Sequence, residues 1–567
     1  MRRVLLVVFP VLLAMTTTSA KKPGDRPSGN ILATRSPAVG RHGMIATSQP
    51  LASAAGLKAL QSGGNAIDAA VTAAAVLAVV EPSMNGIGGD LFAIVYDART
   101  KQVYALDASG RSAAAATPAE FARRGLTEMP GSGPLAVDVP GVVSGWDALL
   151  TRFGTISIDK ALAPAIGYAR DGFPVAELMA EEWKESSEKL AADPAAAATF
   201  LPHGTAPAMG EVFANPRLAR SLELIAAHGK DAFYKGPIAQ AIAADMKARN
   251  GLITAQDLAD HTADWVDTIS VNYRGYDVHE MPPSTQGFVA LEMLNILEGF
   301  DIKAMGHNSA DYLHAVSEAK KIAFADRGAY LADRVFVPSK ALATLLSKDY
   351  AALRRKEIDM KKTGTYRAGA LPGGTSSAPD FAGRDLGDTI YMTAADGQGN
   401  VVSFIQSLFG SFGAGIVAGE TGITLHNRGA GFVLTAGHPN QIGPRKRPLH
   451  TLVPAMIVKE GRPWVSFGVM GGDNQAQAHA QVVMNFVDFG MHVQAAGEAA
   501  RMRHTGEQLA LESGIGPEVR AALEARRHKL RDGRGQMGGY QGILIDPKTG
   551  VLMGGSDPRK DGLAIGW

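Results

Sequence analysis

A threonine at the end of a long glycine- and proline-rich stretch is the first residue of this sequence that suggests chemistry. Leu371–Asp388 (LPGGTSSAPDFAGRDLGD) has no helical or strand periodicity, and Thr389 directly after it opens a strand-like run, TIYMTAAD. A threonine hydroxyl is a weak nucleophile unless a base is held beside it. If the chain is cut between Asp388 and Thr389, the new α-amino group, with a usual pKa of about 7.7–8, can act as that base.

One residue then supplies both the nucleophile and the base. The loop before Thr389 gives the backbone the freedom to place the Asp388 carbonyl at the threonine hydroxyl, so the sequence predicts self-cleavage by an N-to-O acyl shift. A strand that begins with threonine after a loop is also an ordinary structural feature, because strands favour threonine. The pattern alone leaves both interpretations open.

A pair of glycines forms a second candidate element. The segment FGVMGGD (467–473) reads as a strand that runs into Gly471 and Gly472 and then into the helical pattern NQAQAHAQVVMNF. Two glycines between a strand and a helix can present backbone N–H groups to a developing oxyanion. They can equally form a simple strand-to-helix turn.

Several common catalytic signatures are absent from the sequence. There is no G-x-S-x-G nucleophile elbow and no G-x-x-x-x-G-K-[ST] phosphate loop, and NGIGGD (85–90) does not match the dinucleotide fingerprint. The fourteen histidines form neither H-x-x-x-H nor H-E-x-x-H, so no zinc site is predicted. The chain has no cysteine, which excludes a thiolate nucleophile and disulfides. Serine, threonine or a carboxylate is left for covalent chemistry.

The composition is that of a globular protein without a polyanionic partner. The 567 residues include 56 Lys and Arg against 55 Asp and Glu, a formal charge of +1, so neither nucleic acid nor an acidic membrane surface is expected as a partner. Hydrophobic residues make up 46% and charged residues 20% of the chain, which allows a sizeable core.

The first twenty residues, MRRVLLVVFPVLLAMTTTSA, have the pattern of a secretory signal peptide. Two arginines precede an apolar run, which ends at small residues suited to cleavage and is too short for a stable membrane span. A buried N-terminal helix is the alternative. We expect export to the periplasm or the medium, a mature chain that begins near Lys21, and no membrane association after the signal is removed.

The order of expected elements favours sheets covered by helices. Two helices are predicted after Pro50, the second capped by Asn65 with Asp68, and a hairpin follows from LFAIVYD and QVYALD. Helical patterns dominate 117–364, and strand candidates dominate the chain after Asp388, with helices near 474–489 and 517–527 among them. Two antiparallel sheets packed face to face, with helices outside, would accommodate this order.

Taken together, these residues resemble the γ-glutamyltransferase (glutathione hydrolase) family of the N-terminal nucleophile hydrolases. The resemblance covers nearly the whole mature chain. It rests on eight segments in the family's order: GMIATSQPLASAAGLKALQSGGNAIDAAVTAA, EPSMNGIGGDLFAIVYD, DASGR, DTIYMTAADGQGN, GAGIVAGETGI, RPLHTLVPA, MGGDNQAQAHAQ and GGSDPRKDG.

The resemblance implies an α+β fold, a four-layer αββα sandwich built from two chains of one precursor. The large chain would be 21–388, after the signal peptide 1–20, and the small catalytic chain would be 389–567, so that self-cleavage falls between Asp388 and Thr389. The resemblance implies no metal and no organic cofactor, and it implies that the two chains associate after cleavage.

Individual roles also come from the resemblance. The second hydroxyl that orients the nucleophile falls on Ser407, the oxyanion pair falls on Gly471 and Gly472, and the carboxylate-binding arginine falls on Arg111. A guanidinium suits a carboxylate because its planar fork can donate two parallel hydrogen bonds.

The sequence departs from the family pattern where the glutamyl group is bound. The family's asparagine, glutamine and aspartate, which hold the α-ammonium, correspond to Phe409, Arg428 and Gly431, and its paired serines correspond to His450 and Thr451. A cation at Arg428 would repel an ammonium group. The segments SLFGSFGAG, HNRGAGF and RPLHT are more similar to the branch that contains cephalosporin acylases and oxamate amidohydrolases.

The sequence thus predicts a self-processing threonine amidohydrolase or acyltransferase for a small-molecule amide with an acidic acyl group. The first substrate class is γ-glutamyl amides such as glutathione. The alternative is glutaryl-like dicarboxylic monoamides, which lack the α-amino group and suit Arg428. An alternative of another kind is a non-catalytic periplasmic protein that binds an anion with Arg111 and Arg428.

Overall fold

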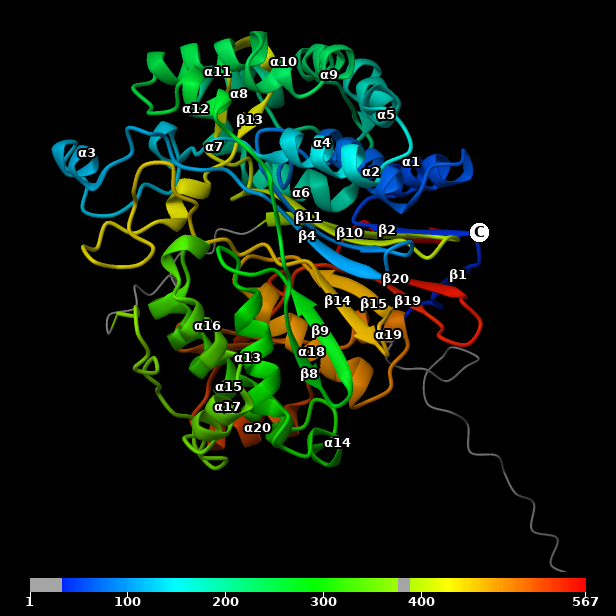
Figure 1. Cartoon of the computed structure of the whole chain (residues 1–567), viewed down its shortest axis with the longest axis vertical. Helices are drawn as coiled ribbons and strands as arrows, with labels where there is room; N and C mark the ends of the chain where they lie inside the picture. The colour runs from blue at the N-terminus through cyan, green and yellow to red at the C-terminus, as the bar shows by residue number, and fades with distance from the viewer. Residues whose placement is uncertain (1–32, 376–387) are drawn as a thin grey trace, which may run out of the picture.

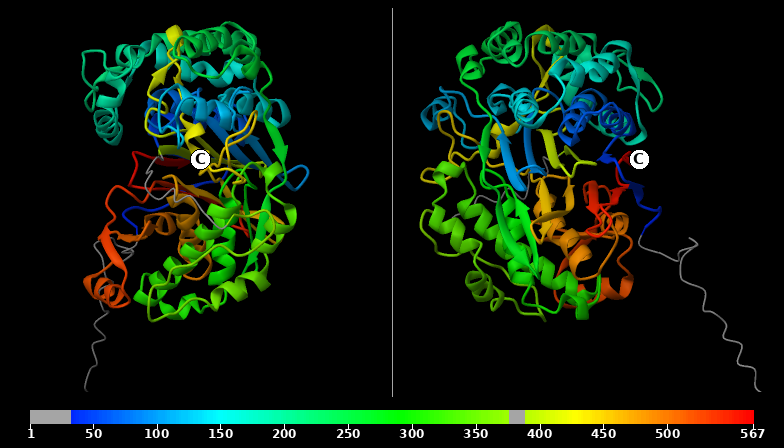
Figure 2. Two further views of the ribbon diagram at one scale, coloured as in Figure 1. Left: turned by 90° about the vertical axis from the view of Figure 1, so that its left-hand side faces the viewer. Right: turned by 45° about the vertical axis from the view of Figure 1, so that its right-hand side comes forward.

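The structure, a computed structural model, describes residues 33–375 and 388–567. Two seven-stranded antiparallel sheets lie face to face, and helices cover the outer face of each (Figures 1 and 2). This arrangement confirms the predicted α+β, four-layer αββα sandwich. The predicted signal peptide and most of the loop before Thr389 lie outside the described residues.

The first sheet contains Thr389 near its centre, on β10. In spatial order its strands are β21 (Leu563–Gly566), β2 (Gly43–Thr47), β10 (Asp388–Asp396), β11 (Val401–Phe409), β3 (Asp90–Asp97), β4 (Gln102–Ala108) and β7 (Asp264–Val266). The second sheet runs β1 (Ala38–Gly40), β20 (Leu552–Ser556), β19 (Tyr540–Ile545), β15 (Arg462–Val469), β14 (Ala455–Lys459), β9 (Tyr276–Glu280) and β8 (Ile269–Tyr273).

The helices divide between the two outer faces (Figure 1). Over the first sheet lie α1 (Pro50–Gln61), α2 (Ala66–Val80), α4 (Val142–Phe153), α5 (Ile158–Asp171), α6 (Glu177–Glu185), α7 (Ser187–Ala191), α8 (Pro194–Phe200), α9 (Pro216–His228), α10 (Asp231–Tyr234), α11 (Pro237–Ala248) and α12 (Ala255–Ala259). Over the second lie α13 (Gly287–Leu297), α14 (Ile302–Met305), α15 (Ala310–Tyr330), α16 (Ser339–Leu345), α17 (Lys348–Arg355), α18 (Asn474–Val487), α19 (Val493–Glu498) and α20 (Pro517–Ala525).

Smaller elements lie around this sandwich. They are the helix α3 (Pro118–Arg123), the pair β5 (Phe173–Pro174) and β6 (Val212–Phe213), the pair β12 (Ile416–Val417) and β13 (Thr424–Leu425), and a three-stranded sheet of β16 (Met502–Thr505), β17 (Gln508–Leu511) and β18 (Lys529–Asp532). No helix in the described ranges combines the length and the hydrophobicity that a membrane crossing requires.

The core explains the depth at which Thr389 lies. Helix α2 is buried along all fifteen residues, as its apolar sequence predicts, and it packs against β10 and β11. At its start the Asn65 side chain accepts from the amide of Asp68, and the Asp68 carboxylate accepts from the amide of Asn65, which is the predicted cap. A layer of apolar side chains fills the space between the sheets and includes Phe92, Ile94, Tyr391, Ile405, Met456 and Ile543.

Candidate active site

Thr389 lies at an irregularity of β10, directly beside Ser407 on β11. Asp388 pairs with Phe409 and Ile390 pairs with Gln406, so β11 has one extra residue opposite Thr389. Such a bulge re-aims the side chains around it. The Thr389 hydroxyl donates a 3.3 Å hydrogen bond to the Ser407 hydroxyl, and both residues are buried. The structure therefore brings together the predicted nucleophile and the predicted second hydroxyl.

Ser407 is itself held in place by the backbone. Its hydroxyl oxygen accepts a 2.7 Å hydrogen bond from the amide of Phe409. Phe409 has a positive φ of 79°, which a non-glycine residue rarely adopts, at the point where the strand ends. The Ser407 oxygen thus accepts from both a fixed amide and the threonine hydroxyl.

A cavity of about 1280 Å³ reaches Thr389. Around the threonine its wall is formed by Gly410, Ser411, Met470 and Gly471. The cavity is more than large enough to hold a small-molecule amide.

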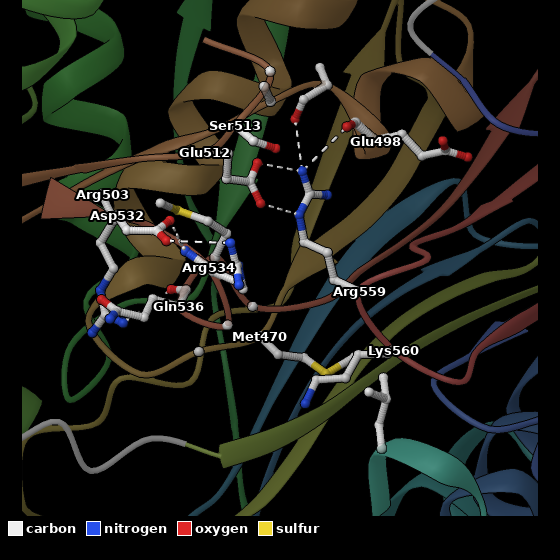
Figure 3. Close-up of a pocket in the computed structure, with 18 of the residues that line it drawn as sticks. Met470, Glu498, Arg503, Glu512, Ser513, Asp532, Arg534, Gln536, Arg559 and Lys560 are labelled. Atoms are coloured by element: carbon white, nitrogen blue, oxygen red, sulfur yellow. Dashed lines mark hydrogen bonds and ion pairs between the residues drawn. The ribbon is translucent and has the colours of Figure 1, made fainter. Parts of the chain in front are cut away.

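The wall of this cavity is rich in charged side chains (Figure 3). Met470 and Lys560 lie next to the strands, whereas Glu512 lies farther from them (Figure 3). The Lys560 ammonium donates to Glu182 at 2.7 Å, and Arg559 donates to Glu512 through two nitrogens at 2.6 Å each. Both cations that are named here are paired with carboxylates of the same wall.

Gly471 and Gly472 connect β15 to α18. Their φ angles are 112° and 55°, a region that favours glycine. Neither amide donates a hydrogen bond to another backbone carbonyl within the described residues. Two N–H groups are thus available at a turn whose first residue lines the same cavity as Thr389.

Three side chains that the sequence did not indicate support this turn. Gln286 donates to the Gly472 carbonyl oxygen at 3.1 Å, and Arg327 donates to Gln286 Oε1 at 2.7 Å and to Asp473 Oδ1 at 2.6 Å. All three side chains come from segments that pack on the second sheet. They tie the glycine turn to the body of the fold.

A second group of predicted residues surrounds Arg428, which is 1% exposed. Its Nε atom lies 3.4 Å from Asp90 Oδ2, its Nη1 donates to the Thr451 hydroxyl at 3.4 Å, and its guanidinium carbon lies 4.1 Å from the centre of the Phe409 ring. Its Nη2 atom has no hydrogen-bond partner in the part of the chain that is described. Burial lowers the pKa of Arg428 to about 10, so the side chain remains charged at neutral pH.

Asp90 connects this cluster to the strand that faces the predicted nucleophile, although it was not among the predicted site residues. It lies opposite Ser407 in the pairing of β3 with β11, and its Oδ1 accepts from the amide of Gly110 at 2.7 Å. Burial alone would raise its pKa, but His426 and the other cations beside it hold the pKa of Asp90 well below its usual range. The sequence signal that could have identified Asp90 is that it is the only acidic residue in the glycine-rich NGIGGD segment.

His450 is buried close to Arg428 and forms no ion pair with any described residue. Neither ring nitrogen has a hydrogen-bond partner among the residues described, and the ring meets that of Phe92 edge-on at 5.0 Å. Burial, followed by the charge of Arg428, lowers the pKa of His450 well below its usual value. His450 is therefore neutral and places two polar nitrogens beside Arg428.

Arg111 lies apart from this group. Its guanidinium donates to Asp264 Oδ2 at 2.8 Å, and no hydrogen bond or ion pair within the described ranges joins it to Arg428, His450 or Thr451. The structure thus places three of the four predicted substrate-binding residues together and the fourth in a different cluster.

One group of described residues has metal-ligating side chains close together. His314, Glu318 and His528 place one ligand atom each within 4.8 Å of one another. The ammonium of Lys321 lies 2.5 Å from Glu318 Oε1, so a resident cation already neutralises that carboxylate. These residues are not among those that line the cavity at Thr389.

Known proteins are similar to this chain in both sequence and architecture. The family profile described as Gamma-glutamyltranspeptidase matches residues 52–567. The chain is 39% identical over 538 residues to the glutathione hydrolase-like YwrD proenzyme of Bacillus subtilis, covering 93% of this chain and 99% of the relative. It is 38% identical over 540 residues to the acylase ACY 1 proenzyme of a Pseudomonas species, covering 94% of each chain.

A solved structure agrees with these matches. The crystal structure of cephalosporin acylase from Bacillus halodurans superposes with a TM-score of 0.88 at 39% identity, covering 96% of this chain and 99% of the other. These named relatives are hydrolases and acylases, which confirms the predicted enzyme class and branch. This chain belongs to the γ-glutamyltranspeptidase family.

Proposed function

We propose that the chain is a self-processing amidohydrolase in which Thr389 is the nucleophile. The observation that carries this proposal is the position of Thr389: its hydroxyl is bonded to Ser407 and it lines a cavity that is also lined by Gly471. The residue directly follows Asp388, so cleavage of one peptide bond creates an amine beside the hydroxyl. Nucleophile, base and oxyanion donors then lie in one place.

Self-cleavage proceeds in two steps. The Thr389 oxygen attacks the Asp388 carbonyl carbon, and collapse of the adduct breaks the C–N bond. The hydroxyl proton passes to the departing nitrogen, so the Thr389 amine is freed and an ester remains between Asp388 and the threonine oxygen. Water then hydrolyses the ester, which releases the Asp388 carboxylate and restores the Thr389 hydroxyl.

The catalytic cycle uses the same atoms on an external amide. The Thr389 amine takes the hydroxyl proton as the oxygen attacks the substrate carbonyl, while the amides of Gly471 and Gly472 donate to the oxyanion. The proton passes to the departing amine and an acyl-threonine ester remains. Water, or an acceptor amine, resolves this ester and frees the enzyme.

The first substrate class is γ-glutamyl amides such as glutathione, which the relatives' names suggest. "Glutathione hydrolase proenzyme" from Escherichia coli is 36% identical to this chain over 556 residues. In this assignment Arg111 holds the carboxylate of the acyl group, and Arg428, His450 and Thr451 contact the rest of its polar end.

A second candidate class is favoured by the cluster around Arg428. Its buried guanidinium has one nitrogen without a partner among the described residues, and a neutral His450 lies nearby, so the cluster can offer donors to a carboxylate. Gly431, where the family has an aspartate, provides no anion for an ammonium group. Glutaryl-like monoamides, which lack the α-amino group, fit these charges.

The proposal includes two chains that stay together, 21–388 and 389–567, with export to the periplasm or medium. The interleaved sheet supports association: β2 and β3 lie before the cut, and β10 and β11, which lie between them, come after it. The signal-peptide pattern of residues 1–20 supports export.

Gel electrophoresis and N-terminal sequencing test the proposal. The enzyme should resolve into pieces of 388 − 20 = 368 and 567 − 388 = 179 residues, the smaller beginning at Thr389, with the first count assuming signal removal after Ala20. Thr389→Ala should abolish both cleavage and hydrolysis of acyl p-nitroanilides, and Thr389→Ser, which keeps a hydroxyl, should retain some of each. An intact wild-type chain that binds anions without turnover would instead identify the non-catalytic binding protein.

A further inference from the structure

A second cluster of charges surrounds the side chain of Asp264, at the start of the edge strand β7. Its Oδ2 atom accepts hydrogen bonds from three arginines: 2.8 Å from Arg111 Nη2, 2.6 Å from Arg334 Nη2 and 2.8 Å from Arg447 Nη1. Three guanidiniums from segments far apart in the chain thus share one half-buried carboxylate oxygen.

The three arginines do not depend equally on Asp264. Arg334 also pairs with Asp107 at 3.2 Å, and Arg447 lies 3.4 Å from Asp107 as well. The only other hydrogen bond of the Arg111 side chain within the described residues is a long one, 3.4 Å to the Thr262 carbonyl oxygen. Arg111 is therefore the member of the cluster that can leave Asp264 while the other two arginines remain.

Arg111 is also linked to the candidate active site through its neighbour Gly110. The amide of its neighbour Gly110 donates to Asp90, and Asp90 lies opposite Ser407 in the sheet. Ser407 in turn accepts from the Thr389 hydroxyl. Arg111 is thus connected to the nucleophile through a short series of backbone and side-chain contacts.

We propose that Asp264 is an internal competitor for Arg111, which the carboxylate of an acidic acyl group displaces. This inference rests on the proposed function, in which Arg111 holds that carboxylate. In the empty site Asp264 keeps the Arg111 cation paired, and an unpaired, partly buried charge would be costly. When a substrate takes Arg111, Arg334 and Arg447 keep Asp264 paired, so neither charge is left without a partner.

The exchange makes Asp264 a specificity-determining residue. An acyl group that ends in a carboxylate must break the bond between Asp264 and Arg111, and this cost weakens its binding. A neutral acyl group leaves that bond in place, so its affinity does not depend on Asp264. Removing the charge of Asp264 should therefore change the binding of acidic acyl groups and not that of neutral ones.

Two anilides of equal acyl length test this difference: glutaryl p-nitroanilide, which carries a carboxylate, and pentanoyl p-nitroanilide, which does not. Asp264→Asn should lower KM for the glutaryl compound about fivefold to tenfold, the scale of one charge-assisted hydrogen bond. KM for the pentanoyl compound should stay within about twofold. A glutaryl KM that rises or stays the same, or an equal change for both anilides, would overturn the inference.

A second variant gives an effect of opposite sign. Arg334→Gln removes a rival for Asp264 Oδ2, so Asp264 should hold Arg111 more tightly and KM for the glutaryl compound should rise about twofold to fivefold. Arg445→Gln is the matched control, because Arg445 is exposed and pairs at 2.9 Å with Asp260 instead. This comparison decides the question even if Asp264→Asn does not fold.

Binding of free glutarate, measured by calorimetry on the processed enzyme, gives a readout besides turnover. Its Kd should fall in Asp264→Asn and rise in Arg334→Gln. If wild-type protein shows no turnover that depends on Thr389, the proposed function fails. If turnover depends on Thr389 but glutarate affinity ignores Asp264, only the competitor inference fails.

Discussion

The hydroxyl of Thr389 donates a 3.3 Å hydrogen bond to the hydroxyl of Ser407, which lies opposite it on the neighbouring strand. The same Ser407 oxygen accepts the amide of Phe409 at 2.7 Å. This contact fixes the direction in which the threonine hydroxyl points before any substrate is present. Four predictions follow from this and related contacts.

Ser407→Ala removes the acceptor that orients the nucleophile. We expect kcat for an acyl p-nitroanilide to fall about 10- to 100-fold, because a misaligned nucleophile loses much of the advantage of positioning. KM should change less than kcat. Ser407→Thr, which restores a hydroxyl, should recover most of the loss, and an unchanged kcat in Ser407→Ala would contradict the orienting role.

Gly471→Ala places a side chain where φ is 112°. The added Cβ would lie 3.2 Å from the Cα of Gly538, so both strain and crowding should move the amides at the turn. We expect a fall in kcat of at least about tenfold, the lower range for loss of an oxyanion donor.

Gly461→Ala provides the matched control for this substitution. Gly461 also has a positive φ, 74°, but it lies in the turn between β14 and β15 with open space around it. Both variants should lose about 1 kcal/mol or more of stability to backbone strain, and only Gly471→Ala should lose activity. Equal losses of kcat would mean that strain alone explains the effect.

Arg428→Gln tests which acyl group the pocket selects. The substitution removes the cation beside Asp90 and the guanidinium that stacks on Phe409. We expect kcat/KM for glutaryl p-nitroanilide to fall about tenfold or more, the scale of a lost charge-assisted contact, while the γ-glutamyl compound is affected less.

Arg428→Lys separates charge from shape at this position. Lysine keeps the charge and loses the planar fork, so it should retain part of the preference for the glutaryl compound. If Arg428→Gln lowers kcat/KM equally for both acyl groups, Arg428 supports the pocket without selecting its ligand. Thermal unfolding of each variant shows whether the loss is one of stability.

From the buried carboxyl group of Glu81 we predict that the free energy of unfolding depends on pH. It is buried at the end of α2, where Ser48 donates to it at 2.5 Å, and burial raises the pKa of Glu81 to about 8. A raised pKa means that the folded state favours the protonated form. The contribution to stability is therefore complete below the unfolded pKa of about 4.5 and is lost as the pH rises toward 8.

Glu81→Gln removes this titration and keeps the shape of the side chain. The variant should match the wild type near pH 4.5 and should become relatively more stable as the pH rises, by an amount on the order of 4 kcal/mol at pH 8. Denaturant unfolding at several pH values measures this difference. Both proteins should carry Thr389→Ala, so that each remains a single uncut chain. A difference that is constant with pH would contradict the assignment.

Much of the fold was predictable because its signals are local. The cap formed by Asn65 and Asp68, the hairpin of β3 and β4, and the start of β10 after a glycine- and proline-rich segment all depend on residues close in sequence. Strand β14 begins at Ala455, directly after Pro454, because proline cannot donate to the strand ladder.

The charges of the site were less predictable because their partners are distant in the chain. Asp90 and Arg428 are 338 residues apart, and Arg111 and Asp264 are 153 residues apart. The sequence pattern indicated the arginines but not the carboxylates that neutralise them. Only the tertiary structure shows that Arg111 already pairs with Asp264 and that one nitrogen of Arg428 has no partner among the described residues.

In one sheet, strands that precede Asp388 alternate with strands that follow it, and this arrangement affects whether unfolding is reversible. A single continuous polypeptide can arrange these strands as it collapses, whereas two severed pieces would have to find each other in solution and thread them in the same order. The proposed scission before Thr389 would therefore make unfolding irreversible. The processed protein should be kinetically stable because its unfolding barrier is high. A denatured sample should not refold when the denaturant is diluted.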